Sequence, residues 1–122
     1  MPIESQEDLD AVIGARFHAR RVRSLRPLIS AEIVEEHRRA PLGPHSEVLQ
    51  RVLNYLGLFP IDGKLITEQD GSQWFVCRLA GFPALRANRV AGPFETESRA
   101  LHEVFRLRLL DVFGLSFSVP AQ

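Results

Sequence analysis

The four histidines are the side chains in this sequence best suited to binding a metal ion or moving a proton. They are His18, His37, His45 and His102, and no two have the short spacing that places a pair of ligands on one helical turn. We expect His37 to be a partly buried structural residue on a helix face and His102 to face the solvent. The sequence therefore predicts no metal ligand and no cofactor-binding residue in this chain.

Cys77 is the only cysteine, which excludes an internal disulfide and a cysteine-rich zinc site. It lies in an apolar predicted strand, where a thiol is usually an unreactive small apolar side chain. Adjacent carboxylates such as Glu35 and Glu36 point in different directions on a helix, and no glycine pattern matches a phosphate-binding loop. We predict no catalytic residue. An alternative enzyme hypothesis is a small site assembled from His37, His102 and Cys77.

Arginine dominates the basic residues, since Lys64 is the only lysine among 15 basic side chains. Five arginines crowd the end of the first predicted helix: Arg16, Arg20, Arg21, Arg23 and Arg26. A guanidinium suits interfacial ion pairs because it is weakly hydrated and can bind a carboxylate through two hydrogen bonds. Codon usage in a GC-rich genome is the simpler explanation for the arginine bias as a whole. The Arg cluster is nevertheless a candidate partner-binding surface.

The overall charge gives little support to nucleic-acid binding. Fifteen acidic residues balance the 15 basic ones, and the isoelectric point is about 6.9, whereas nucleic-acid-binding modules are usually basic. A stand-alone nucleic-acid-binding domain that uses a sheet and the Arg cluster is the alternative function. The cations expected on that sheet are Lys64, Arg78, Arg86 and Arg89.

Composition indicates one soluble globular domain over residues 1–122. Apolar residues make up 45% of the chain and charged residues 25%, which is ordinary for such a domain. No apolar run approaches the roughly 20 residues that cross a bilayer, so no membrane partner is expected. The N-terminal segment is acidic and polar rather than a signal peptide, and the expected location is the cytoplasm.

The first half of the sequence predicts three helices. Their expected spans are about 5–25, 31–40 and 46–56. The first carries an apolar stripe at helical spacing that includes Phe17. Ser30 is expected to cap the second helix, and Gly57 is expected to end the third in a left-handed conformation.

The second half predicts a small antiparallel sheet packed by one helix. The helical period gives way to alternation near Gly63, and an Asp70-Gly71 hairpin turn follows. The expected strands are Lys64–Glu68, Gln73–Leu79 and a third within Leu85–Val90. The last helix, about 97–113, begins after an N-cap at Thr96 and ends at Gly114. It must cover one sheet face, because three strands cannot bury their apolar side alone. The predicted fold class is α+β.

Two apolar segments lack an evident internal role. They are the connection with Leu58, Phe59 and Ile61, and the tail at 115–122 with Leu115, Phe117 and Val119. Arginine and aromatic residues are the usual anchors of interfaces, so Leu58, Phe59 and Phe117 join the Arg cluster as candidate partner-binding residues. The alternative is that the connection fills the domain's own core and the tail folds back on it. A net charge near zero also favours a homo-oligomer when the chain is isolated.

Three ordered segments resemble the small subunit of N,N-dimethylformamidase. They are EIVEEHRRAPLG at Glu32–Gly43, LQRVLNYLGLFP at Leu49–Pro60 and FETESRALHEVFRLRLLDV at Phe94–Val112. In the last segment the matching positions are Phe94, Thr96, Ala100, Val104 and Phe105. Ser98 and Arg99 replace acidic positions of the family. The resemblance covers residues 32–112, so the Arg cluster and the tail flank it.

The resemblance implies an accessory role in an assembly. In that family a large subunit carries the iron site that hydrolyses dimethylformamide to dimethylamine and formate, and the small subunit supplies no iron ligand. We therefore expect a non-catalytic subunit that binds and supports a large iron-dependent amidohydrolase subunit, with iron in the partner and no cofactor in this chain. The flanking Arg cluster and tail suggest a docking surface specific to this chain.

Overall fold

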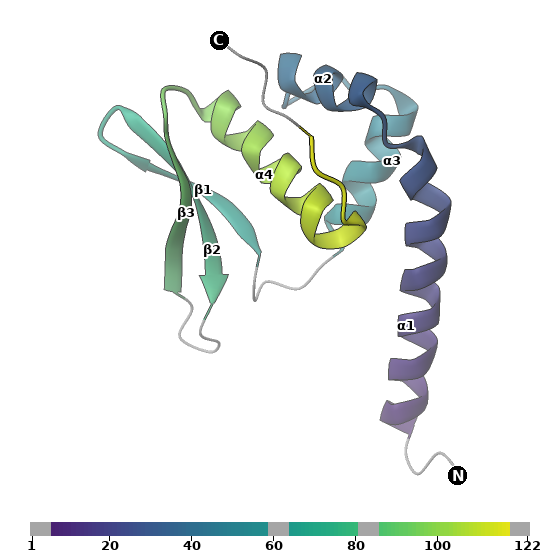
Figure 1. The fold of residues 1–122 in the computed structure, drawn as a ribbon. Coiled ribbons are helices and arrows are strands. Elements are labelled where there is room, and N and C mark those ends of the chain that lie inside the picture. The colour runs from purple at the N-terminus through teal and green to yellow at the C-terminus, as the bar shows by residue number, and fades with distance from the viewer. Residues whose placement is uncertain (1–5, 59–63, 81–85, 118–122) are drawn as a thin grey trace.

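Within the part of the chain that the structure describes, four α-helices and three strands follow one another in the predicted order. The structure is a computed structural model that describes residues 6–58, 64–80 and 86–117, with side chains from residue 15 onward. The elements are α1 (Gln6–Leu25), the 3₁₀ helix η1 (Arg26–Leu28), α2 (Ala31–Arg39), α3 (Glu47–Leu56), β1 (Leu65–Asp70), β2 (Gln73–Ala80), β3 (Arg86–Phe94) and α4 (Glu97–Phe113). The predicted α+β fold is confirmed (Figure 1).

Ser30 and Thr96 cap α2 and α4 as predicted, and Ser46, for which no capping role was predicted, caps α3 in the same way. Ser30, Ser46 and Thr96 each accept a hydrogen bond from the backbone N–H three residues later, at 3.5, 3.2 and 3.2 Å. Each cap satisfies an N–H group that has no partner within the first helical turn. Gly114 then ends α4 in the left-handed conformation, with φ +69°.

Gly57 corrects one local prediction. It follows α3 in the right-handed conformation, with φ −71° and ψ −10°, so the expected left-handed cap is wrong. Its N–H donates to the carbonyl of Leu53 at 3.0 Å, which extends the helical hydrogen bonding by one more residue. Because Gly57 keeps a right-handed conformation, the chain does not change direction here as it does after a left-handed cap.

The sheet is antiparallel with the strand order β1-β2-β3. The hairpin turn lies one residue later than expected, because Asp70 still pairs with Gln73 and the turn is Gly71–Ser72. Gly71 has φ +63°, the conformation that a two-residue hairpin turn requires at its first central position. The third strand, β3, is longer than the predicted Leu85–Val90 and runs on through Phe94.

Helix α4 packs on the sheet through one of its faces. Ala100 and Val104 contact Leu65 of β1 and Val76 of β2 in a small core. Arg108 ties the same layers together by donating a 3.2 Å hydrogen bond to the carbonyl of Leu65. The expected helix-on-sheet packing is therefore confirmed, and Figure 1 shows α4 lying across the strands.

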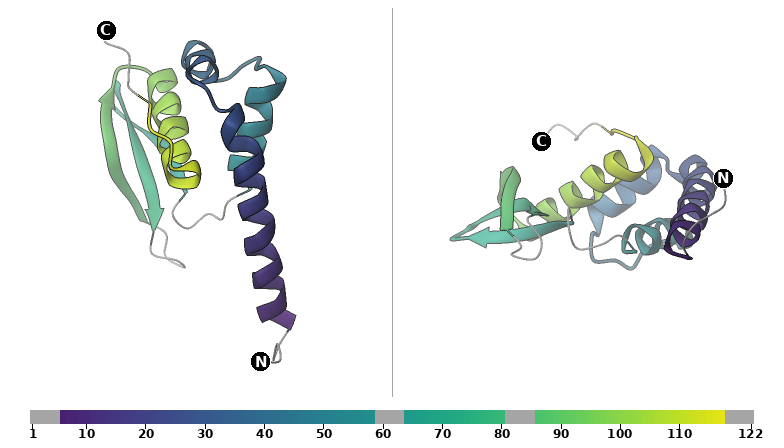
Figure 2. Two further views of the ribbon diagram at one scale, coloured as in Figure 1. Left: turned by 45° about the vertical axis from the view of Figure 1, so that its right-hand side comes forward. Right: turned by 90° about the horizontal axis from the view of Figure 1, so that it is seen from below.

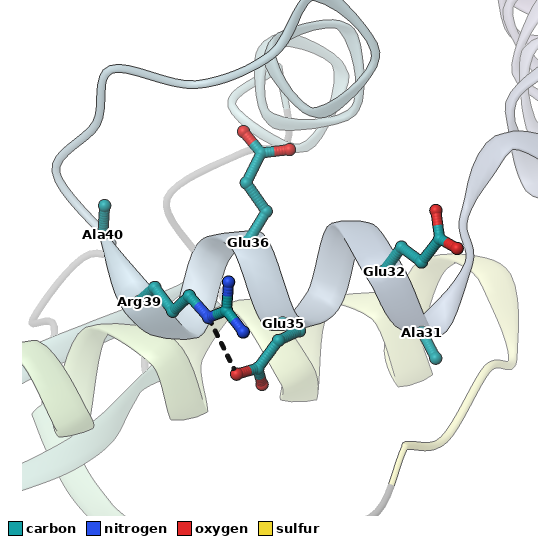
Figure 3. A pocket seen from close by; sticks show the side chains of 6 residues that line it. All are labelled: Ala31, Glu32, Glu35, Glu36, Arg39 and Ala40. Carbon is teal, nitrogen blue, oxygen red and sulfur yellow. Dashed lines mark hydrogen bonds and ion pairs between the residues drawn. The ribbon is translucent and has the colours of Figure 1, made fainter.

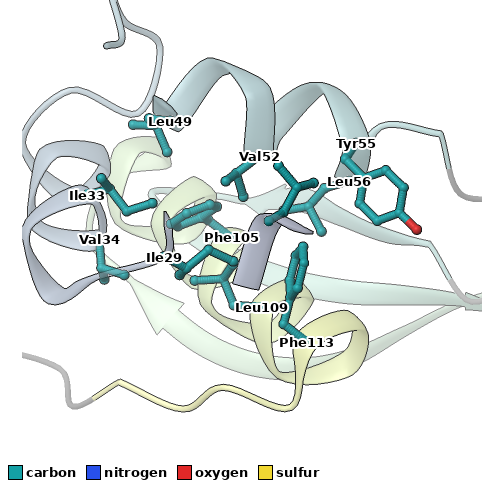
Figure 4. Close-up of a cluster of buried hydrophobic side chains, with 11 residues drawn as sticks. Ile29, Ile33, Val34, Leu49, Val52, Tyr55, Leu56, Phe105, Leu109 and Phe113 are labelled. Carbon is teal, nitrogen blue, oxygen red and sulfur yellow. The ribbon is translucent and has the colours of Figure 1, made fainter. Parts of the chain in front are cut away.

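The opposite face of α4 completes a larger core with the other helices. Figure 4 shows these side chains converging from α2, α3 and α4. The buried members are Leu25, Ile29, Ile33, Val34, Leu49, Val52, Tyr55, Leu56, Phe105, Leu109 and Phe113. Helix α4 thus joins two cores, one with the sheet and one with the helices.

Gly92 of β3 lies in close contact with β2. Its φ is +117°, a region that favours glycine, and an added Cβ would lie 2.9 Å from the Phe75 ring and 3.0 Å from the Trp74 carbonyl oxygen. Gly71 has a comparable positive φ of +63°, but an added Cβ there meets no atom within 4 Å. A side chain at either position would strain the backbone, but only one at Gly92 would also clash with neighbouring atoms.

We expect Gly92→Ala to lower the free energy of unfolding by about 2 kcal/mol or more, because strain and conflict combine there. Gly71→Ala is the matched control, and strain alone should cost it about 1 kcal/mol. Urea denaturation of both variants at neutral pH measures the difference. Equal losses would contradict the close packing of β3 on β2.

Candidate partner-binding surface

The second half of α1 carries most of the Arg cluster on one exposed face. Arg16, Arg20 and Arg23 are all exposed, and their spacing of four and three residues aligns them along the helix. Arg26 is also exposed, in η1. No hydrogen bond or ion pair within the described residues involves these guanidinium groups. Their hydrogen-bond donors are therefore available to a partner.

Arg21 differs from the other arginines because it lies against the body of the protein. Its guanidinium carbon is 5.8 Å from the centre of the Tyr55 ring, and the hydroxyl of Tyr55 also hydrogen-bonds His18. Leu25 is 2% exposed, and Val22 packs against the same helical core. One face of α1 is thus anchored on α3, which fixes the direction of the opposite face.

Phe17 is a candidate contact that the sequence analysis missed. The apolar stripe suggested a core-facing side chain, but Phe17 is 58% exposed, beside Arg16 and three residues before Arg20. Figure 2 shows the reason, since α1 runs away from the other elements and leaves most of its length without a neighbour. An exposed aromatic residue among arginines has the composition of an interface anchor.

The predicted connection is described only at its start. Leu58 is 75% exposed, in agreement with its role as a candidate partner-binding residue. Phe59 and Ile61 lie outside the described residues, so their predicted roles stay predictions. Leu58 follows directly after the C-cap of α3, the helix on which α1 is anchored.

The start of the tail folds back on the protein. Leu115 and Phe117 pack against the helical core, and Arg106 donates to the carbonyl of Phe117 at 3.1 Å. Arg106 is held in turn by an ion pair with Glu103. The alternative that the tail folds back on the domain holds for Leu115 and Phe117, because α4 offers them an apolar surface. The partner-binding role of Phe117 stays a prediction, and Val119 lies outside the described residues.

Two of the histidines meet in the interior. His37 of α2 and His102 of α4 are 4% and 6% exposed, and their Nδ1 atoms are 3.0 Å apart. The solvent-facing position expected for His102 is wrong. Burial lowers the pKa of both side chains from 6.5 to about 4. The signal was present in the sequence, because His102 shares the i, i+3, i+7 face of Phe105 and Leu109.

Cys77 does not join these histidines. Side chains alternate along β2, so Val76 faces α4 and Cys77 points to the other side of the sheet, opposite Ile66 of β1. The thiol is fully buried, and burial raises its pKa. The hypothetical enzyme site of His37, His102 and Cys77 is therefore not assembled, since the sheet separates the thiol from the imidazoles.

Two of the four cations expected on the sheet are engaged with carboxylates. Arg78 pairs with Asp111 of α4 at 2.9 Å, and Arg89 pairs with Glu68 and Asp70 at 2.6 and 2.9 Å. A guanidinium already bound to a carboxylate is a poorer ligand for a phosphate. The sheet therefore gives the nucleic-acid hypothesis no support, and that hypothesis stays a prediction.

A shallow hollow along α2 is lined by acidic side chains, two of which are engaged within the protein. Figure 3 shows Glu32, Glu35 and Glu36 around it. Arg38 donates to Glu35 at 2.7 Å and lowers the pKa of that carboxyl to about 2. Glu36 accepts from the backbone N–H and the hydroxyl of Ser46 at 2.6 and 2.7 Å. These carboxylates stabilise α2 and the loop that follows it.

Two features are absent from the described ranges 6–58, 64–80 and 86–117, namely a metal-binding cluster and a membrane-spanning helix. No group of three or more His, Cys, Asp or Glu side chains there could hold a metal ion. No helix there is long and apolar enough to cross a membrane. The predicted absence of a cofactor in this chain stays a prediction.

Comparison with known proteins identifies the family. A family model described as the N,N-dimethylformamidase alpha subunit matches residues 12–116. The chain belongs to the N,N-dimethylformamidase alpha subunit family. An N,N-dimethylformamidase alpha subunit from Paracoccus aminophilus is 37% identical over 89 residues, which are 66% of this chain and 60% of that relative. One from Alcaligenes sp. is also 37% identical over 89 residues, or 66% of this chain and 64% of the relative.

The alpha subunit match reaches further than the motifs alone indicated. It begins at residue 12 rather than 32, so the Arg cluster lies inside the matched range instead of flanking it. This corrects the expectation that the docking surface lies outside the shared region. The matched segment spans less than two thirds of both curated alpha subunits.

We expect Phe117→Ala to lower the free energy of unfolding by about 1–3 kcal/mol, because this ring packs on the helical core. Leu58→Ala is the control, and it should change stability by no more than about 0.5 kcal/mol because the side chain is 75% exposed. Thermal or urea unfolding of the two variants and the wild type measures these changes in stability. An unchanged Phe117→Ala midpoint would show that the tail is not part of the core in solution.

Proposed function

We propose that this chain is a non-catalytic accessory subunit that binds and supports the large subunit of an N,N-dimethylformamidase-like amidohydrolase. The observation that carries the proposal is the exposed row of Arg16, Arg20 and Arg23, in a chain of the alpha subunit family. Helix α1 extends away from the other helices and the sheet over much of its length (Figure 2), and the three arginines on it are exposed. Three exposed guanidinium groups with no partner among the described residues fit a partner surface that bears carboxylates.

The proposed contact combines charge with apolar anchors. Phe17 and Leu58 are 58% and 75% exposed, and Phe59 belongs to the proposed set from its sequence alone. Buried aromatic side chains supply most of the binding energy in such interfaces, while surrounding arginines steer the partner and fix its orientation. In the absence of the large subunit, the same exposed apolar side chains favour self-association of the chain.

Hydrolysis of the amide and the iron that supports it are assigned to the large subunit in this proposal. Among the described residues no group of three or more His, Cys, Asp or Glu side chains could hold a metal ion, since His37 and His102 hydrogen-bond each other and Cys77 lies across the sheet. No chemical step is therefore assigned to residues of this chain. Its proposed contribution is to hold the catalytic subunit in its active assembly, in the cytoplasm.

We expect the charge reversal Arg20→Glu to raise the dissociation constant for the large subunit at least tenfold, and Arg16→Glu/Arg20→Glu to raise it further. The reason is that each change replaces an attractive charge pair with a repulsive one at the contact. Titration by surface plasmon resonance at two salt concentrations measures the effect. Wild-type binding should weaken more with salt than binding of the double variant.

Arg86→Glu is the matched control, since Arg86 is equally exposed but lies on β3. It should leave the dissociation constant within about twofold of the wild-type value. All variants should retain wild-type stability, because no described contact involves these side chains. If Arg86→Glu weakens binding and Arg20→Glu does not, the docking surface lies on the sheet and the assignment to α1 is wrong.

A further inference from the structure

His37 and His102 form a buried polar contact that the proposed function does not use. Their Nδ1 atoms are 3.0 Å apart between α2 and α4. The Phe105 ring stacks on His37 with a centroid distance of 4.2 Å and lies 6.3 Å from His102. The ring of His45, in the loop after α2, stacks on the ring of His37 with a centroid distance of 5.9 Å. The contact is thus part of the packing between two helices rather than a surface interaction.

The chemistry of this contact depends on the number of protons it holds. Two neutral imidazoles form the hydrogen bond when one Nδ1 carries the hydrogen and the other accepts it. One added proton places a positive charge in a buried position. A second added proton makes both Nδ1 atoms donors, so the hydrogen bond is lost and two like charges face each other. The contact between α2 and α4 is therefore favourable when both imidazoles are neutral, and it is lost when both are protonated.

The surroundings compensate added positive charge only in part, because burial and the basic neighbours lower the pKa of both imidazoles while Glu36 raises that of His37 and Glu35 that of His102. The charged and titratable groups that face the pair are Glu35, Glu36 and Arg38 of α2, His45 of the following loop and Arg106 of α4. The two carboxylates are already engaged, Glu35 by Arg38 and Glu36 by Ser46. The arginines and His45 disfavour further protonation.

We propose that the His37–His102 contact is an acid-sensitive junction, which holds α2 against α4 at neutral pH and weakens as the pair takes up protons. The core between α4 and the sheet has only apolar buried members among the described residues, Leu65, Val76, Ala100 and Val104. Protonation of the pair therefore acts on the contact with α2, because no imidazole belongs to this core. This inference does not rest on the proposed docking function.

The direction of the pH dependence follows from the lowered pKa values. Both imidazoles have a pKa of about 4 in the folded chain and 6.5 as the ordinary value, so the unfolded chain binds more protons between these limits. The stability contributed by the neutral pair is present above pH 6.5 and is lost as the pH falls toward 4.

Two measurements on the full 122-residue chain test the junction. The first is an NMR titration of the histidine ring signals in the wild-type chain, in which His37 and His102 should stay neutral at pH 6 and titrate below pH 5. The second is urea unfolding of the wild type and of His37→Phe/His102→Phe at several pH values. Replacing both polar partners with apolar rings of similar shape can leave stability at neutral pH nearly unchanged.

Between pH 7 and pH 5 the folding equilibrium constant of the wild type should fall by a factor on the order of a hundred more than that of the double variant. His45→Gln is the control, and it should retain the steep wild-type dependence. A ring of the pair that titrates above pH 6 overturns the proposal, as does an equal pH dependence of wild type and double variant. If the double variant does not fold, the wild-type titration decides alone.

Discussion

Helix α4 is buried on two sides, and the rest of the fold depends on this one arrangement. Its Ala100 and Val104 face packs on the sheet, while Phe105, Leu109 and Phe113 belong to the helical core. A three-stranded sheet and three further helices could each bury little apolar surface alone. Because α4 serves both, loss of its packing would separate the two halves of the domain.

The same arrangement leaves α1 as the element with the least internal packing. Its C-terminal end is fixed by Leu25 and by the contact of Arg21 with Tyr55, while Arg16, Arg20 and Arg23 on its other face are exposed. Glu35 of α2 and Arg78 and Arg89 of the sheet are engaged in ion pairs within the protein, whereas no described residue pairs with the α1 row. Because those charged groups are already paired and the α1 arginines are not paired with any described residue, α1 is favoured as the surface for a partner.

Local chemistry made much of this fold predictable. Ser30 and Thr96 located two helix starts, and the change from helical to alternating apolar residues located the sheet. Long-range packing was harder to predict. His37 and His102 are 65 residues apart, and the sequence around either one does not indicate that the two side chains meet. The tail illustrates the same limit, because the surface that receives Phe117 exists only after α4 has packed. The Arg cluster of α1 was predicted, but the alignment of Arg16, Arg20 and Arg23 on one face and the exposure of Phe17 were not.

Hydrogen–deuterium exchange of this chain, free and bound to a dimethylformamidase large subunit, tests the central claim most directly. The account predicts slower amide exchange over residues 15–25 of α1 in the complex, because docking excludes solvent and suppresses opening of that helix. Exchange in β3 should stay the same. Protection confined to the sheet, with α1 exchanging equally fast in both states, would contradict the account.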